Sequence, residues 1–338
     1  VPRNAPALFN LGAHEFTTMF HDGRLEADPT RPSGIRTPLG TEMVQGFASV
    51  LSAQSMFPVL SPDEMAGHYT ESDVARAVRQ GFLTGEDGAW SLISARVADI
   101  KEYQSAFEQI NGPGHSVTFT DISDVIAEFI AFEWRADDSP FDQYLRTGEP
   151  LPKAAHSGMS LFYGKAQCST CHAGQFQTDH DFHAIALPQV GPGKSARFET
   201  HARDEGRLRV TGNPADAYKF RTPSLRNIAQ TAPYGHNGAY ATLEAMIRHH
   251  LDPVASLKAY NVAQLVLPDL PNSQDFRATH DPDEQAAIAA ANELSPSNLS
   301  ETEIIQIVAF LNALSDTASL AGKLGVPQTV PSGLPVDQ

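Results

Sequence analysis

Apolar residues recur three and four positions apart along much of this chain, the spacing that places them on one face of an α-helix. The first clear stretch follows Asp73, which can cap a helix, and a second runs from about 91 to 107. A third follows Asp121, another residue suited to capping. The apolar positions of the first and third stretches are Val74, Ala77, Val78 and Phe82, then Ile122, Val125, Ile126, Phe129 and Ile130.

The second half of the chain shows the same spacing. A helix is predicted from about Lys153 to Gly164, another from about Thr242, and a last one from Ser300, with Glu303 completing a capping box. Its apolar face comprises Ile304, Ile307, Val308, Leu311 and Leu314. Alternation long enough for a sheet is absent, so the pattern predicts a mainly α fold.

Pro and Gly mark the boundaries between the predicted domains. Residues 146–152 indicate a linker, and the segment after about Gly322 a loosely packed tail. We therefore expect one domain over 1–148, a second over 149–316 and a tail over 317–338, within a chain of 338 residues.

Composition narrows the function classes. The net charge of −16 argues against nucleic acid. It indicates a solvated acidic surface, and a basic protein partner is the alternative. No run of 18 apolar residues occurs, so no membrane span is expected. The two cysteines, Cys168 and Cys171, are too close in sequence for an unstrained disulfide, which leaves a role in binding a cofactor or metal.

Cys168-Ser169-Thr170-Cys171-His172 has the C-x-x-C-H spacing of covalent haem attachment. Two thiols add to the two porphyrin vinyl groups, and the adjacent histidine binds the iron. A thioredoxin-like redox pair is disfavoured, because it needs a preceding strand and no histidine. A zinc site recruiting His180 and His183 is also disfavoured, because its spacings are shorter than those of zinc fingers.

The second axial position of the iron needs another ligand. In the predicted helix after Thr242, His250 shares a face with Leu243, Met246 and Ile247, whereas His249 is turned by about 100° from that face. We therefore favour His250. A histidine buried in the core without a ligand role and ligation by Met246 stay open as alternatives.

Six further segments resemble the bacterial di-haem cytochrome c peroxidase family, which includes the MauG-type enzymes. They recur in family order between residue 1 and about 315. They are Arg3-Asn4-Ala5-Pro6, Phe20-His21-Asp22-Gly23-Arg24, Ser61-Pro62-Asp63-Glu64-Met65, Asp204-Glu205-Gly206-Arg207, Thr222-Pro223-Ser224-Leu225-Arg226-Asn227 and Pro233-Tyr234-Gly235-His236-Asn237-Gly238.

The resemblance implies two cytochrome c-like domains with long loops, each binding a haem c through its own C-x-x-C-H. Only the second motif is present here. The family's first motif precedes the Arg-Asn-x-Pro segment, so we expect it upstream of residue 1, in a segment missing from the given chain, rather than lost from the protein. Residues 1–148 would then be the remainder of the peroxidatic domain.

Family spacing also implies ligands. The family's distal ligand to the second haem lies 17 residues beyond a calcium-binding proline, and here Pro233 is followed at that distance by His250. Histidine replaces the usual Met or Tyr, which implies a low-spin bis-histidine iron with a lowered potential. The calcium site would use carbonyl oxygens of Thr231 and Pro233 and the side chain of Asn4.

The family's peroxide pocket matches Gln54, Pro58 and Glu64 in spacing, with Glu64 as the acid–base catalyst. An ordinary surface glutamate is the alternative. His21 stands where the family usually has a tryptophan between the haems. Arg207 and Arg226 are candidates to pair with haem propionates or to form structural ion pairs.

The leading hypothesis is a periplasmic oxidoreductase that reduces hydrogen peroxide, with electrons relayed through the C-terminal haem iron from a small cytochrome c or cupredoxin. One alternative is a mono-haem electron carrier on the same scaffold. Another is a MauG-like enzyme that oxidises residues of a partner protein, which the replacement of tryptophan by His21 weakens. Family members are often dimers, so a homodimer is a candidate assembly.

Overall fold

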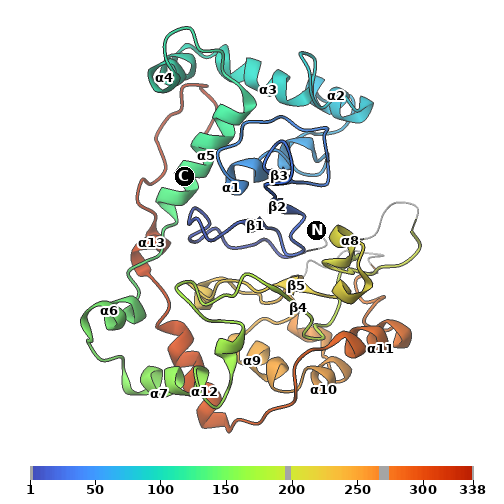
Figure 1. Ribbon diagram of the computed structural model, residues 1–338, viewed down its shortest axis with the longest axis vertical. Helices are drawn as coiled ribbons and strands as arrows, with labels where there is room; N and C mark the ends of the chain where they lie inside the picture. The colour runs from blue at the N-terminus through green and yellow to red at the C-terminus, as the bar shows by residue number, and fades with distance from the viewer. Residues whose placement is uncertain (1–2, 195–198, 266–273, 337–338) are drawn as a thin grey trace. The chain divides into compact units, whose positions relative to one another are not determined.

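The computed structural model describes residues 3–194, 199–265 and 274–336 (Figure 1). The fold is mostly helical, as the apolar spacing predicts, and its strands are two or three residues long. Contacts divide the chain into two compact units. The described parts of the N-terminal unit are 10–19, 24–135 and 321–336, and those of the C-terminal unit are 3–9, 20–23, 136–194, 199–265 and 274–320. The predicted domain boundaries at 148 and 316 stay a prediction.

The N-terminal unit combines a small antiparallel sheet with helices. The sheet has the order β1-β2-β3, with Thr18 opposite Glu26 and Glu26 opposite Arg36. The elements are β1 (Thr18–Met19), β2 (Leu25–Ala27), β3 (Ile35–Arg36), α1 (Val50–Gln54), the 3-10 helix η1 (Pro58–Leu60), α2 (Asp73–Gln80), α3 (Ala89–Ala98), α4 (Lys101–Asn111) and α5 (Phe119–Glu133).

Several predicted helices of this unit begin or end elsewhere. Ser72 caps α2, and a left-handed Gly81 ends it, so Phe82 falls outside the helix and is exposed. The helix expected over 91–107 is two helices, because the chain leaves helical geometry at Ile100. Thr118 caps α5, with Asp121 as the reciprocal partner of a capping box.

The C-terminal unit carries the remaining elements. A second small sheet pairs Phe182 with Arg221 and His183 with Phe220. The elements are α6 (Pro140–Thr147), α7 (Lys153–Phe162), η2 (Cys168–Thr170), β4 (Phe182–His183), α8 (Leu208–Thr211), η3 (Pro214–Asp216), β5 (Phe220–Arg221), η4 (Ile228–Gln230), α9 (Leu243–Leu251), α10 (Pro253–Lys258), η5 (Val262–Gln264), α11 (Pro282–Ala291), α12 (Glu301–Asn312) and α13 (Thr317–Ala321).

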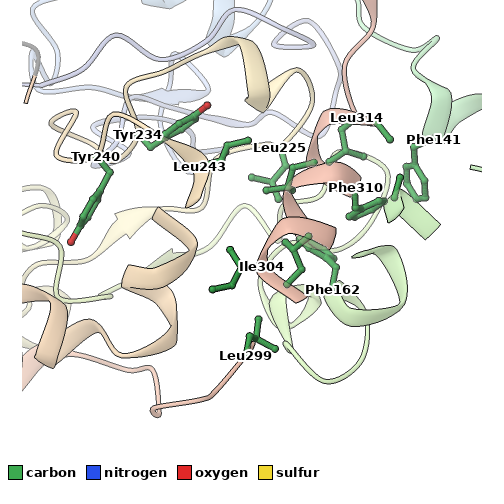
Figure 2. Close-up of a cluster of buried hydrophobic side chains, with 14 of the residues drawn as sticks. Phe141, Phe162, Leu225, Tyr234, Tyr240, Leu243, Leu299, Ile304, Phe310 and Leu314 are labelled. Atoms are coloured by element: carbon green, nitrogen blue, oxygen red, sulfur yellow. The ribbon is translucent and has the colours of Figure 1, made fainter. Parts of the chain in front are cut away.

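The core of this unit forms where α7 and α12 cross (Figure 2). A Cβ added to Gly158 would lie 1.8 Å from the carbonyl oxygen of Gln306, so only glycine permits this approach of the two helices. Phe310 is fully buried and meets Phe141 and Phe162 edge to face, with ring centroids 5.2 Å apart in each pair. This crossing fixes the end of α7, from which the chain runs into the cysteine motif.

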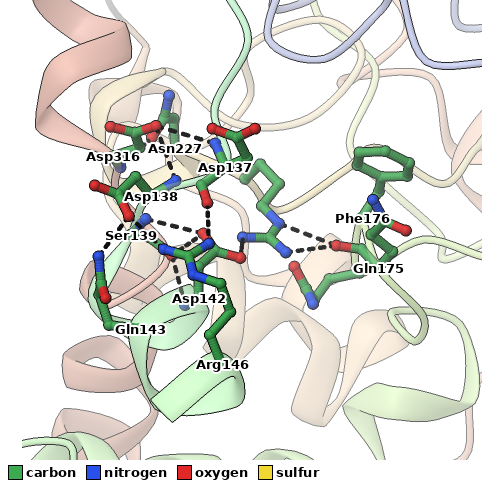
Figure 3. Close-up of polar contacts among 12 residues, drawn as sticks. Asp137, Asp138, Ser139, Asp142, Gln143, Arg146, Gln175, Phe176, Asn227 and Asp316 are labelled. Carbon is green, nitrogen blue, oxygen red and sulfur yellow. Dashed lines mark hydrogen bonds and ion pairs between the residues drawn. The ribbon is translucent and has the colours of Figure 1, made fainter. Parts of the chain in front are cut away.

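A polar network fixes the start of α6, a helix that the sequence interpretation missed (Figure 3). Ser139 caps it, and the side chain of Asp142 returns the bond to Ser139. Asp316 accepts hydrogen bonds from the backbone of Asp137 and Asp138, and its own N–H donates to Asn227. These bonds join the start of α6, the residue that precedes η4 and the segment after α12 around one polar centre.

Candidate haem site

The cysteine motif forms a tight turn beyond the end of α7. Gln167 adopts a left-handed conformation with φ of 55°, and η2 follows. The backbone N–H of His172 donates to the carbonyl of Cys168 at 2.9 Å, which closes the turn. Both cysteines are free thiols, and burial raises the pKa of Cys168 to about 11. The turn therefore presents two unpaired sulfur atoms beside one imidazole.

His172 has one ring nitrogen engaged and one available. Its Nδ1 lies 3.1 Å from the carbonyl oxygen of Gln177, and no described residue hydrogen-bonds to Nε2. A backbone carbonyl on one nitrogen is the usual second contact of a metal-binding histidine, because it fixes the tautomer and directs the other nitrogen at the metal. Burial, with a smaller effect of His250, lowers the pKa of His172 to about 4, so the ring is neutral as ligation requires.

His250 repeats this arrangement on α9. Its Nδ1 lies 2.9 Å from the carbonyl oxygen of Met246, one helical turn earlier, and no described residue hydrogen-bonds to Nε2. Burial lowers its pKa as well. Because the charge of His250 acts on the pKa of His172, the two rings lie within electrostatic reach of each other. Two neutral imidazoles with free Nε2 atoms suit the two axial positions of one iron.

His249 is excluded by its own contacts. It is fully buried, its Nδ1 lies 2.9 Å from the hydroxyl of Tyr240, and its Nε2 lies 2.7 Å from the carbonyl oxygen of Ile185. Both nitrogens are thus used within the protein, which makes His249 the buried core histidine and leaves His250 available. Met246 packs against the hydrophobic core and offers its carbonyl to His250. The assignment of His250 stays a prediction that this geometry favours.

The two rival interpretations of the motif fit less well. A helix, α7, precedes the cysteines where a thioredoxin-like pair needs a strand. The predicted zinc set is not assembled, because the group of neighbouring ligand atoms found among the described residues joins Cys171 and His183 with Asp179, without Cys168 or His180. Both nitrogens of His183 already lie 2.9 Å from carboxylates, those of Asp179 and Glu293.

Two of the three predicted calcium ligands meet. Asn4 Nδ2 donates to the carbonyl oxygen of Pro233 at 2.7 Å, and the backbone N–H of Asn4 donates to the carbonyl of His236. A 180° rotation of the Asn4 amide would turn its oxygen to the Pro233 carbonyl, as a cation requires. Thr231 ends the preceding turn, η4, two residues earlier. The calcium site stays a prediction.

His21 belongs to the same cluster. Its Nε2 lies 2.9 Å from the carbonyl oxygen of Asn4, and its ring centroid lies 6.5 Å from that of His236. Burial lowers the pKa of His21 to about 4, so the ring is uncharged near neutral pH. Sequence reasoning placed His21 and Asn4 in separate roles and did not include His236, whose ring stacks on Phe220 at 3.6 Å.

A buried ion cluster that the sequence interpretation missed supports this region. Arg3 pairs with Asp22 and Asp204, each at 2.7 Å, and all three residues are buried. All three lie in segments noted for family resemblance, but only the fold brings positions 3, 22 and 204 together. Such a network fixes the N-terminal segment that carries Asn4.

The two arginines proposed for propionates have other partners. Arg226 is buried, pairs with Asp142 at 2.5 Å and donates twice to the carbonyl of Gln175, contacts drawn in Figure 3. For Arg226, the alternative of a structural ion pair is therefore favoured over binding to a propionate. Arg207 donates to the carbonyl of Gly23 at 2.9 Å and stacks over Phe182, with its guanidinium carbon 4.2 Å from the ring centroid.

The predicted peroxide-pocket residues lie in one short stretch of the N-terminal unit. Gln54 ends α1 and Pro58 begins η1. The carbonyl of Pro58 accepts from the N–H of Met65 at 3.2 Å, which brings the neighbouring Glu64 back toward η1. Glu64 is exposed, as an ordinary surface glutamate would be. Its catalytic role stays a prediction.

Comparison with known proteins agrees with the resemblance. Residues 1–149 match the family described as di-haem cytochrome c peroxidase. The chain is 29% identical over 280 residues to cytochrome-c peroxidase IdrP1 of Denitromonas iodatirespirans, which aligns 75% of this chain with 65% of that protein. It is 28% identical to the methylamine utilization protein MauG of Methylorubrum extorquens, over 61% of this chain and 50% of that protein. The chain thus spans less than two thirds of the length of these relatives.

The fold has a counterpart among solved structures. A MauG-like protein associated with microbial copper homeostasis superposes with a TM-score of 0.58 and 25% identity, over 94% of this chain and 76% of that one. This likeness extends over both compact units, whereas the family match ends at residue 149. The resemblance to the di-haem cytochrome c peroxidases and MauG proteins is therefore confirmed: residues 1–149 match the family model, and most of the chain is similar to these relatives and to a solved MauG-like structure.

Proposed function

We propose that the C-terminal unit binds one haem c through Cys168 and Cys171, with His172 and His250 as axial ligands, and relays electrons within a peroxidase-type oxidoreductase. One observation carries this proposal. His172 and His250 each have Nδ1 at a backbone carbonyl and an Nε2 that no described residue hydrogen-bonds, and the charge of His250 acts on the pKa of His172. His249, the neighbour on α9, has neither nitrogen free.

The residues of the site have separate tasks. The haem, when bound, supplies one-electron chemistry at its iron. The carbonyls of Gln177 and Met246 orient the two imidazoles and keep each in one tautomer. Burial lowers the pKa of both rings, which keeps their nitrogens unprotonated for ligation. Two histidine ligands favour a low-spin iron with a lowered reduction potential.

The proposed enzyme also has a calcium site and a peroxide pocket. Asn4, Thr231 and Pro233 would hold a calcium ion with waters, next to His21. Glu64, with Gln54 and Pro58, would move a proton between the peroxide oxygens. That step needs a second haem, for which this sequence contains no further C-x-x-C-H. Covalent haem attachment and the relatives favour a periplasmic location and a small electron-donor protein as partner.

Two alternative functions follow from particular residues. The single C-x-x-C-H favours a mono-haem electron carrier on this scaffold. The similarity to MauG favours oxidation of a partner protein, which His21 in place of tryptophan opposes. A count of haem per chain in the native protein, by pyridine haemochrome and intact mass, separates the first from a peroxidase. To distinguish a MauG-like enzyme from a peroxidase, peroxide turnover with a small cytochrome is compared with peroxide-driven modification of a protein.

The axial assignment has its own test. His250→Ala is expected to convert the haem from low spin to high spin, because it removes an imidazole whose Nε2 no described residue hydrogen-bonds. His249→Ala is the matched control, and its spectrum should remain low spin. An unchanged low-spin optical spectrum in His250→Ala would overturn the assignment.

A further inference from the structure

One buried arginine of the C-terminal unit has no anionic partner among the described residues. Arg221, on β5, is only 9% exposed. Its Nε donates to the carbonyl of Phe20 at 3.3 Å, but its buried Nη1 has no acceptor, and no described carboxylate pairs with it. Burial alone lowers the pKa of Arg221 to about 10, with no neighbouring charge contributing. The guanidinium is therefore a desolvated cation without compensation.

The other buried arginines of this unit are neutralised. Arg3 lies between Asp22 and Asp204, and Arg226 pairs with Asp142. Leaving a buried charge without a partner is strongly destabilising. The described part of this unit pairs two buried guanidiniums and leaves a third unpaired, which makes the third a position suited to an anion.

The backbone next to Arg221 is linked to the loop that holds the predicted iron ligand His172. The next residue, Thr222, accepts a hydrogen bond through its carbonyl from the hydroxyl of Thr178 at 2.8 Å. Thr178 directly follows Gln177, whose carbonyl holds the ring of His172. Phe182, opposite Arg221 in the small sheet, lies on the same loop. The backbone beside Arg221 is thus linked, through the Thr222–Thr178 hydrogen bond and the neighbouring Gln177, to the imidazole beside which the haem would attach.

We propose that Arg221 binds a propionate carboxylate of the haem attached at Cys168 and Cys171. This inference rests on the proposed function, since it requires that haem. A haem propionate is an anion that stays attached to the cofactor, and the planar guanidinium offers the parallel N–H donors that fit a carboxylate. Arg207 and Arg226, the sequence-based candidates, donate hydrogen bonds to protein oxygens.

The charge of Arg221 has a consequence for redox chemistry. A cation near the porphyrin stabilises the reduced iron, which carries one positive charge fewer, and it neutralises a propionate that would stabilise the oxidised iron. In a buried site this interaction is screened little by solvent. Arg221 therefore acts as a positioning residue that fixes the propionate and raises the midpoint potential of the haem.

The test uses the haem-loaded full chain. Arg221→Gln removes the charge, Arg221→Lys keeps it without the guanidinium fork, and Arg209→Gln is the control, an exposed arginine in the same unit that pairs with Glu199 and Glu205. Three quantities are measured for each: haem per chain, midpoint potential by spectroelectrochemistry, and the propionate bending mode by resonance Raman spectroscopy. Haem count first establishes that each sample is loaded.

The expected result is a shift of the midpoint potential to a lower value in Arg221→Gln, a smaller shift in Arg221→Lys and none in Arg209→Gln. The propionate mode should move in both Arg221 variants only. Loaded variants with wild-type potential and propionate mode would overturn the inference and leave the proposed function intact. A wild-type protein without covalent haem would overturn both. If Arg221→Gln fails to mature, Arg221→Lys decides by its propionate mode.

Discussion

Two helices with nearly the same amphipathic pattern have different environments in the two units. Both α5 and α12 begin with a capping box, from Thr118 and Ser300 respectively. Seven residues after their caps stand Val125 and Ile307, which are 39% and 1% exposed. Fourteen residues after them stand Phe132 and Leu314, which are 54% and 0% exposed. The same spacing of apolar residues therefore gives an open face in one helix and a buried face in the other.

The two apolar faces differ in exposure because of the segments packed against them and not because of the helices themselves. The face of α12 is covered by α7, which Gly158 allows to approach closely. Within the described part of the N-terminal unit, α5 packs on α1 and α3, and the face with Phe129 and Phe132 stays exposed. An amphipathic pattern specifies a helix with one apolar face, whereas the cover of that face comes from another segment.

The largest expected effect comes from blocking the approach of α7 to α12. Gly158→Ala places a Cβ against the carbonyl of Gln306, so the helices must separate, and we expect a loss of about 3 kcal/mol or more in the free energy of unfolding. Denaturant unfolding followed by circular dichroism measures it. Ser160→Ala, at an exposed position of α7, should change the free energy by less than about 0.5 kcal/mol.

Truncating one apolar residue on each helix measures how much a packed neighbouring helix adds to the free energy of unfolding. Ile307→Ala should cost about 3 kcal/mol, because the site is fully buried, whereas Val125→Ala should cost about 1 kcal/mol or less. Urea unfolding of both variants gives the two values. Equal losses would show that the face of α5 is covered in solution.

The buried ion cluster makes the C-terminal unit sensitive to acid. Burial alone would raise the pKa of Asp204, but the hydrogen bond and charge of Arg3 lower it to about 2, below its ordinary 3.8. The stabilisation is therefore present above about pH 4 and is lost as the pH falls toward 2, by about 2 kcal/mol. Unfolding free energies between pH 5 and 2 test this, and Asp204→Asn should flatten the dependence. A profile that keeps its slope in this variant would contradict the assignment.

Removing the N-cap hydroxyl should give the smallest loss of unfolding free energy, and the same loss in both helices, because capping is local. Thr118→Ala and Ser300→Ala each remove a hydroxyl that accepts from the third residue of the helix, and each should cost about 1 kcal/mol. Thermal unfolding of the two variants compares them. A clear inequality would mean that the environment of the helix alters the strength of its cap.

The candidate site shows the same division between local and tertiary information. The spacing of Cys168, Cys171 and His172 was readable directly, and the helical face of α9 favoured His250. The reason for that preference appears only in the structure, where His249 is engaged through both nitrogens and His250 through one. Helix periodicity distinguishes faces, but hydrogen bonds to distant carbonyls leave no pattern in the sequence.

The arginines show most clearly that some properties of the site depend on tertiary contacts and not on local sequence. Sequence similarity drew attention to Arg207 and Arg226, and the fold gives both of them protein partners. Arg221 carried no signal, since an unpaired charge is defined by the absence of a neighbour, which depends on every segment packed around it. The break between α3 and α4 and the helix α6 were likewise missed, because local capping by Ser139 and the turn at Ile100 override apolar spacing.

The sequence by itself therefore determined the helical class, the cysteine motif and the amphipathic faces, because each depends on residues within a few turns of one another. The tertiary structure decided which faces are covered, which histidine has a free nitrogen and which buried arginine lacks a counter-charge. Those properties depend on contacts between positions as far apart as 3 and 204, or 142 and 226, which only the folded chain brings together.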